Sequence, residues 1–273
     1  MSRRLALAMI ALLGPSNVLH AQQLTGRDQW ADSARVRIDA ATQHNDVAAL
    51  ETTRVMLDRA LAVFPRDPLL LHYLGYSLFR EAILSIRDPA AKNEVGDLLQ
   101  AAQDALEQSA DKLKLPETYA LESAVYGQKI GLRPNPLTIM RLGPRTNTAM
   151  AEAIASGPRN PRVWLLRGIG AMFRPRMWGG GTDKAESYLM QAVSLYDTDY
   201  PTPPLPAWGH AEAYIWLGQA YTKDGKRAAA RDAFQKAITL EPDNQWARQL
   251  LASTYSTAQG SRETDITKSD LPM

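Results

Sequence analysis

The chain has 273 residues, of which 45% are hydrophobic, and it contains no cysteine. The absence of cysteine excludes disulfide bonds, thiolate metal sites and cysteine nucleophiles, so stability has to come from apolar burial. The formal net charge is only +2, with 31 Lys and Arg against 29 Asp and Glu, which argues against a general affinity for nucleic acid.

Residues 1–21 have the pattern of a cleavable secretory signal. Arg3 and Arg4 precede an apolar run over residues 5–13, and Ala21 supplies a small residue before the expected cut. The run is too short to span a bilayer, which takes about 20 residues. A lipoprotein signal would need a cysteine at the cut. We predict export to a periplasm or to the medium, and an amphipathic N-terminal helix of a cytosolic protein is the alternative.

Apolar residues recur at helical spacing along residues 22–257, and no strand pattern of useful length interrupts them. Proline follows several of the apolar segments, and it ends a helix because it cannot continue the hydrogen-bond ladder. We expect one continuous helical array over 22–257 and a disordered polar tail over 258–273. The predicted helices cover 28–45, 48–64, 67–86, 90–113, 116–131, 137–156, 161–173, 182–197, 209–223 and 227–240, with a capping helix over 244–257.

Charge is unevenly distributed along this array. Residues 133–178, which we call the basic segment, carry eight arginines, no lysine and one acid, whereas the regions on either side are net acidic. Arginine presents a planar fork that meets a carboxylate or a phosphate with two hydrogen bonds, so the segment is a candidate for ligand contact. A solvated face whose arginines pair with acids of adjacent helices is the alternative. The candidate contact residues are Arg141, Arg145, Arg162, Arg174 and Arg176.

Two loops interrupt the helical pattern, at 174–181 and 198–208. The first places Trp178 before three glycines, and the second is rich in proline and ends in Trp208. Insertions in helical repeat proteins usually lie on one face, which is often the binding face. Each tryptophan is therefore a candidate for the wall or lid of a pocket. The alternative is that each one pins its own loop to the helices.

Residues 211–242 hold the clearest internal pattern. Their spacing resembles the tetratricopeptide repeat, and weaker matches occur upstream at Trp164 with Gly168 and at Leu74 with Gly75. The resemblance implies an all-α, right-handed solenoid of about five helix pairs plus a C-terminal capping helix. The residues that carry it are Tyr214, Leu217, Gly218 and Tyr221 in the first helix, and Ala230, Phe234, Ala237 and Pro242 in the second.

The same resemblance implies which residues face the concave groove of the solenoid. In one unit these positions are mostly apolar, and in the next unit they are mostly polar. A groove that is part apolar and part basic suits an extended peptide or an amphipathic acid. The candidate groove residues are Arg162, Leu165, Ile169, Phe173 and Gln219.

Residues 115–250 also resemble a narrower set of exported tetratricopeptide proteins. The features are the sequence NPRVWLLRG at 160–168, the Pro-x-Met-Trp-Gly-Gly-Gly loop that begins at Pro175, and PAWG at 206–209. They are similar to those of the T component of TRAP-type transporters, a periplasmic helical protein that assists a solute-binding subunit. This resemblance implies a transporter-accessory protein that oligomerises and handles a small anionic solute.

Signatures of an enzyme are missing from the sequence. The histidines after the predicted signal, His44, His72 and His210, are scattered singly without the paired spacing of a metal site. No nucleophile elbow is present. We therefore expect no catalysis, no cofactor and no metal. The preferred hypothesis is an exported binding or scaffold protein, not embedded in a membrane, that holds a protein or peptide partner in its groove; the transporter-accessory role is the second.

Overall fold

The computed structural model describes residues 26–86 and 88–255, so the expected signal over 1–21 and the expected tail over 258–273 lie outside the described residues. The described residues form helices joined by loops and contain no strand, which confirms the predicted all-α class. Residues 245–255 are also helical. The elements are α1 (Gly26–His44), α2 (Val47–Val63), α3 (Pro68–Ser85), η1 (Pro89–Ala91), α4 (Lys92–Ala110), α5 (Pro116–Leu132), α6 (Pro136–Ser156), α7 (Pro161–Phe173), η2 (Arg176–Trp178), α8 (Thr182–Tyr196), α9 (His210–Lys223) and α10 (Arg227–Leu240).

Local sequence explains where most of these helices begin. The first turns of α3, α5, α6 and α7 contain proline, whose missing N–H is not needed there. Side-chain oxygens of the residues before α2, α3, α6 and α7 accept hydrogen bonds from free backbone N–H groups of the first turn. These capping residues are Asp46, Asp67, Asn135 and Asn160.

Consecutive helices pack as pairs, α3 with α4, α5 with α6, α7 with α8 and α9 with α10. Three of the pairs approach closely at a glycine. A Cβ atom at Gly168 of α7 would lie 2.6 Å from Leu189 Cγ of α8, and the glycines of α3 and α9 face Leu106 and Phe234 in the same way. The first helices of successive pairs also contact one another, α3 with α5, α5 with α7 and α7 with α9. The pairs therefore stack into a solenoid, as predicted.

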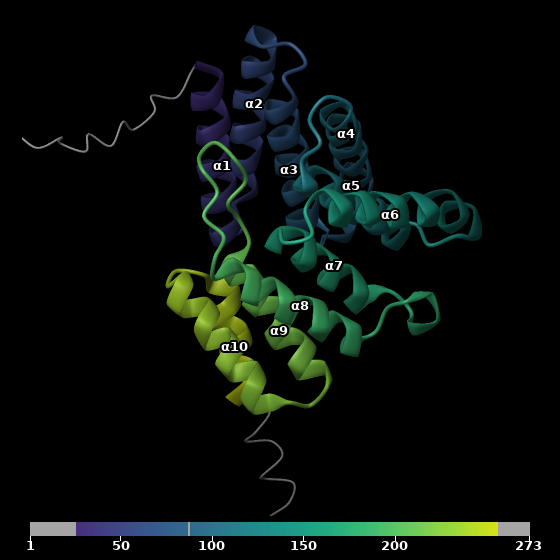
Figure 1. Cartoon of the computed structure of the whole chain (residues 1–273), viewed down its shortest axis with the longest axis vertical. Coiled ribbons are helices and arrows are strands. Elements are labelled where there is room, and N and C mark those ends of the chain that lie inside the picture. The colour runs from purple at the N-terminus through teal and green to yellow at the C-terminus, as the bar shows by residue number, and fades with distance from the viewer. Residues whose placement is uncertain (1–25, 87, 256–273) are drawn as a thin grey trace, which may run out of the picture.

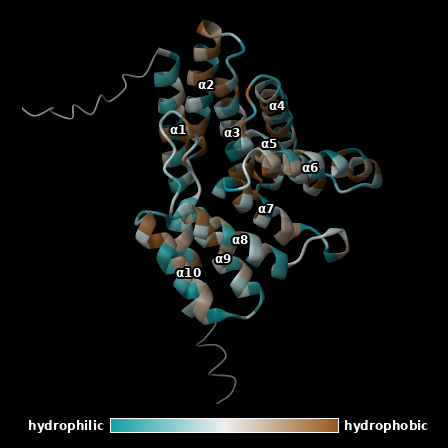
Figure 2. Ribbon diagram, in the orientation of Figure 1, coloured by the Kyte–Doolittle hydropathy of each residue, from teal (hydrophilic) through white to brown (hydrophobic). Residues whose placement is uncertain are grey.

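One continuous cluster of buried apolar side chains extends from α1 to α9, and a smaller cluster joins α9, α10 and the segment 245–255. Hydrophobic and hydrophilic residues are mixed along every helix instead of being concentrated in one part of the chain (Figure 2). Among the described helices, none combines the length and the apolar character needed to cross a membrane.

The stack turns so that its two ends approach each other (Figure 1). The long loop between α8 and α9 reaches back to α3, where Tyr73 contacts Pro204, and α9 and α10 lie below the N-terminal helices in this view. Arg80 of α3 forms an ion pair with Glu212 of α9, with Nη1 3.1 Å from Oε1. This turn decides which predicted groove residues remain open.

Candidate functional site

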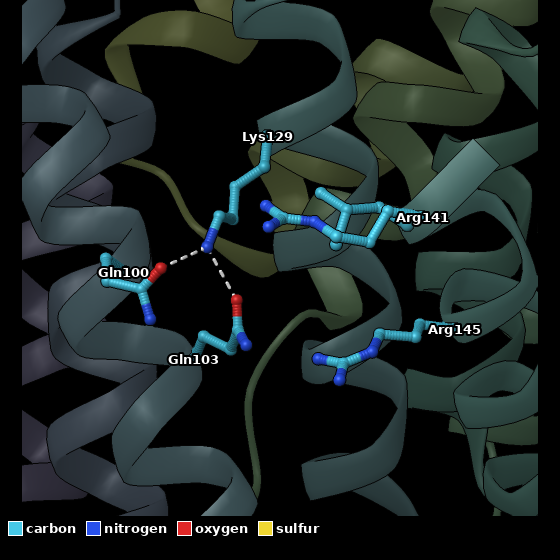
Figure 3. Close-up of a pocket in the computed structure, with 6 residues that line it drawn as sticks. Gln100, Gln103, Lys129, Arg141 and Arg145 are labelled. Atoms are coloured by element: carbon cyan, nitrogen blue, oxygen red, sulfur yellow. Dashed lines mark hydrogen bonds between the residues drawn. The ribbon is translucent and has the colours of Figure 1, made fainter. Parts of the chain in front are cut away.

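A hollow of about 240 Å³ lies between α4, α5 and α6 (Figure 3). We call it the basic hollow, and an adjoining hollow of about 420 Å³ shares part of its lining and continues it toward the start of α6. The basic hollow is lined by Gln100, Gln103, Lys129, Arg141, Leu142 and Arg145.

Each of the three helices contributes part of the polar lining. Gln100 and Gln103 come from α4, and Lys129 comes from α5. Arg141 and Arg145 are four residues apart on α6, so their side chains leave the same face of that helix. In Figure 3 the Lys129 amine points between the two glutamines, and the arginines extend from the opposite side.

Lys129 is held by neutral oxygen atoms. Its Nζ donates to Gln100 Oε1 and to Gln103 Oε1, both at 2.6 Å. The amide nitrogens of the two glutamines donate in turn to Asp104 Oδ1 and to Glu107 Oε1, each at 2.8 Å. Burial lowers the pKa of Lys129 below its ordinary value, and Arg141 and Arg145 lower it further, while Asp104 and Glu107 act in the opposite direction. The ammonium therefore lacks a directly bound counter-charge.

Glu107 of α4 interacts with several donors beside the basic hollow. Tyr126 Oη donates to Glu107 Oε1 at 2.7 Å, and the same oxygen lies 3.6 Å from Arg145 Nη1. Within the described part of the chain, Arg141 forms no ion pair. Of the three cations that line the hollow, only Arg145 is ion-paired among the described residues, and the unpaired positive charge suits a carboxylate or a phosphate.

The structure divides the other sequence-predicted site residues between the interior and the surface. Arg162 and Leu165 of α7 are buried, with exposed fractions of 2% and 0%. They do not line an open groove, because the loop between α8 and α9 covers them: Asp199 pairs with Arg162, and Gly209 lies against Leu165. Trp208 is also buried and stacks on Tyr76, so it pins its loop to the helices.

Phe173, Ile169 and Gln219 lie near the junction of α7 and α9. Phe173 is exposed, and its ring makes an edge contact with Trp216 at a centroid distance of 5.7 Å. Lys223 Nζ lies 5.2 Å from the centroid of the Phe173 ring. Ile169 packs at the edge of the main core, and Gln219 is partly buried.

The loop after α7 holds the last three candidates. Trp178 is 54% exposed. Arg174 donates to Asn147 Oδ1 of α6 at 3.2 Å, and Arg176 lies 3.8 Å from Asp183. The structure thus brings only Arg141 and Arg145 into the basic hollow. Reasoning from the sequence missed Gln100, Gln103 and Lys129, which lie outside the basic segment and reach the arginines only through packing of three helices.

We find no metal-binding site in residues 26–86 and 88–255. No group of three or more histidines and carboxylates there is arranged to hold a metal ion. The polar groups of the basic hollow are amides and cations, which suit an anion and not a metal.

Comparison with known proteins supports the repeat fold. Residues 211–244 match the tetratricopeptide repeat family. The HusA haemophore from Porphyromonas gingivalis has a similar structure, with a TM-score of 0.59 and 21% identity, covering 73% of this chain and 96% of its own. The thermophilic tetratricopeptide protein TTC0263 from Thermus thermophilus has a TM-score of 0.59 and 20% identity, covering 84% and 98%. No curated protein matches the sequence. These likenesses show a tetratricopeptide solenoid.

Proposed function

We propose that this protein is a non-enzymatic binding protein that takes an acidic segment of a partner protein into the basic hollow. Helical repeat solenoids present extended surfaces that bind other proteins. The observation that carries the proposal is that Lys129, Arg141 and Arg145 line one hollow, while only Arg145 forms an ion pair within the described part of the chain.

The chemistry of the basic hollow favours a carboxylate. Arg141 has no ion pair among the described residues and can present its fork to an incoming carboxylate. An anion beside Lys129 would also offset the nearby cations that lower the pKa of this lysine. The adjoining hollow adds Asn135, Thr138 and Leu132, so neighbouring residues of an extended peptide have polar and apolar contacts.

The direct test is the affinity of a fluorescein-labelled hexaglutamate peptide, measured by fluorescence anisotropy. We expect the variant Arg141→Glu, Arg145→Glu to bind at least about tenfold more weakly, which corresponds to about 1.4 kcal/mol. Arg159→Glu is the matched control, because Arg159 is an exposed arginine of the same basic segment and lies outside the hollow. Equal losses in the two variants would show only general attraction to positive charge and would contradict the proposal.

A small anionic solute is the second candidate, and the limited volume of the hollow, about 240 Å³, favours it. Succinate and inorganic phosphate are the probes for calorimetry. Hemin, which carries two carboxylates, is added because the structurally similar HusA is described as a haemophore. One of these solutes could bind in a way that depends on Arg141 and Arg145 while the peptide does not bind. That result would favour the transporter-accessory function over peptide binding.

We also propose that the protein is exported and acts in a periplasm or outside the cell. The support is the basic start, the short apolar run and the small residue at position 21. N-terminal sequencing of protein purified from its producing cells is expected to begin at Gln22. A sequence that begins at Met1 or Ser2 in the cytosolic fraction would contradict export.

A further inference from the structure

The loop between α8 and α9 fills the inner side of the solenoid. We call residues 199–208 of this loop the strap. It contacts α3 and α7, which are distant in the sequence, and the end of α8; Pro206 and Trp208 are buried while Tyr200 is 86% exposed. Three different kinds of contact hold it, to a guanidinium, to hydroxyl donors and to an aromatic ring.

A carboxylate clamp holds the start of the strap. Arg162 Nη1 donates to Asp199 Oδ2 at 2.7 Å, and Arg162 Nη2 donates to Asp199 Oδ1 at 3.0 Å. The guanidinium is fixed in place by Glu117, which accepts from Arg162 Nε at 3.0 Å and from Asn160 Nδ2 at 2.6 Å. The two-pronged geometry is the one by which arginine recognises a carboxylate of another molecule.

Tyrosines hold the rest of the strap. Tyr73 Oη of α3 donates to the carbonyl of Pro204 at 2.5 Å, and Tyr196 Oη donates to the carbonyl of Trp208 at 2.9 Å. The Tyr76 ring stacks on the Trp208 indole at a centroid distance of 4.8 Å. Proline lacks an N–H, so a proline-rich segment is recognised through its carbonyl groups and by packing on aromatic rings.

The fit between the strap and its surroundings is incomplete. Trp208 Nε1 is buried without a hydrogen-bond partner in the structure, which is costly for a buried donor. The middle of the strap is open to solvent, since Tyr200 is exposed and Leu205 is 42% exposed. Because this donor belongs to the strap, displacement of the strap would expose it to solvent and remove that cost.

We infer that the strap is a built-in occupant of a peptide site on the concave face, and that this site accepts an extended partner segment with an acidic residue followed by prolines once the strap is displaced. The site consists of Tyr73, Tyr76, Arg162 and Tyr196. This site is separate from the basic hollow, so an experiment can contradict one of the two proposals without contradicting the other. A covalently attached occupant has an effective concentration in the mM range, which excludes weaker external segments.

The test supplies the strap as a separate peptide. In one variant of the full chain, residues 199–208 are replaced by a Gly-Ser sequence of equal length. The probe is a fluorescein-labelled peptide with the sequence of residues 197–209, DTDYPTPPLPAWG. We expect it to bind the replaced variant and raise its Tm, and not to bind the parent chain. The same peptide carrying Asp199→Asn is expected to bind at least about tenfold more weakly.

Two further substitutions locate the binding of this peptide. In the replaced variant, Tyr73→Phe removes one hydroxyl and is expected to weaken the peptide severalfold, whereas Arg141→Glu with Arg145→Glu is expected to leave its affinity unchanged. If the replaced variant does not fold, the full chain with Asp199→Asn takes its place, because it keeps Trp208 and loses only the clamp. A folded variant that does not bind the peptide, or binding that Tyr73→Phe leaves unchanged, would overturn the inference.

Discussion

Asp39 of α1 lies beside other ionisable groups where the two ends of the solenoid meet. Its pKa is raised from 3.8 to about 7, mainly by burial and next by the nearby charge of Glu241. Glu212 acts in the same direction, while Arg80 and Arg35 oppose the shift. The folded protein thus binds more protons than the unfolded chain between about pH 4 and pH 7, and its stability falls as pH rises through this window.

This direction of the pH dependence gives a prediction for the substitution Asp39→Asn, which removes the titrating carboxyl group. We expect the variant to be more stable than the parent at pH 8 by roughly 1–2 kcal/mol, because one pKa unit corresponds to about 1.4 kcal/mol and relaxation reduces the full shift. The advantage should disappear near pH 4. Urea denaturation at several pH values measures it, and an advantage that is constant across pH would contradict the assignment. The pKa of Glu122, which burial raises to about 7, affects both proteins equally.

At the scale of single helices, the glycines of α7 show where close packing is required. A Cβ atom at Gly168 would lie 2.6 Å from Leu189 Cγ and 3.4 Å from the carbonyl oxygen of Ala185, whereas at Gly170 nothing lies within 4 Å. The two positions are on the same helix, so their intrinsic helix preferences are matched and only the packing differs.

Alanine at these two positions should therefore have opposite effects. We expect Gly168→Ala to destabilise the fold by about 1–3 kcal/mol through overpacking against α8. Gly170→Ala should be neutral or stabilise by up to roughly 1 kcal/mol, because glycine is a poor helix former. Urea denaturation monitored by circular dichroism distinguishes them. Equal changes for both variants would show that α7 and α8 are not in close contact at Gly168.

The helices and their pairing could be predicted from the sequence because their signals are local. Proline, capping residues and apolar spacing mark each helix, and small residues such as Gly218 mark each close contact within a pair. The contacts that build the two candidate sites join distant residues. Lys129 of α5 forms a hydrogen bond with Gln100 of α4, and Tyr73 forms one with Pro204, which is 131 positions away in the sequence. Repeat spacing predicts neighbours, and it carries no information on how far the stack turns back on itself.

For the same reason Arg162 could be selected from the sequence as a carboxylate-binding residue, but the residue that supplies the carboxylate could not be predicted. The bidentate contact exists in the structure, and its carboxylate belongs to Asp199 of the same chain. Repeat spacing places Arg162 on the inner face of its helix, while the course of the strap depends on Tyr73 and Tyr76 of a distant pair.

For the whole molecule, contact between the two ends changes how the solenoid should unfold. Repeats of an open solenoid contact only their neighbours. Here Arg80 Nη1 donates to both carboxylate oxygens of Glu212, at 3.1 and 3.2 Å, and both side chains are largely buried. This pair and the strap link the first helices directly to α9, so we expect the described helices to unfold as one cooperative unit.

A double-mutant cycle tests the strength of this link. We expect Arg80→Met and Glu212→Leu to show a coupling free energy of about 1–3 kcal/mol, since each single change leaves a buried charge without its partner. The exposed pair of Lys226 and Glu186, with Nζ 2.6 Å from Oε2, is the control and should couple less strongly. Equal coupling in the two pairs would mean that Arg80 and Glu212 do not hold the ends together.

The central claim is that the basic hollow receives an acidic partner segment while the strap still occupies the concave face. Hydrogen–deuterium exchange of the full chain with saturating hexaglutamate tests this most directly, because it maps where the peptide binds. We predict slower exchange in residues 96–103 of α4, 126–132 of α5 and 136–145 of α6, with no change in α3 or in residues 199–208. Protection confined to α3, α7 and the strap, or no protection at saturation, would contradict the account.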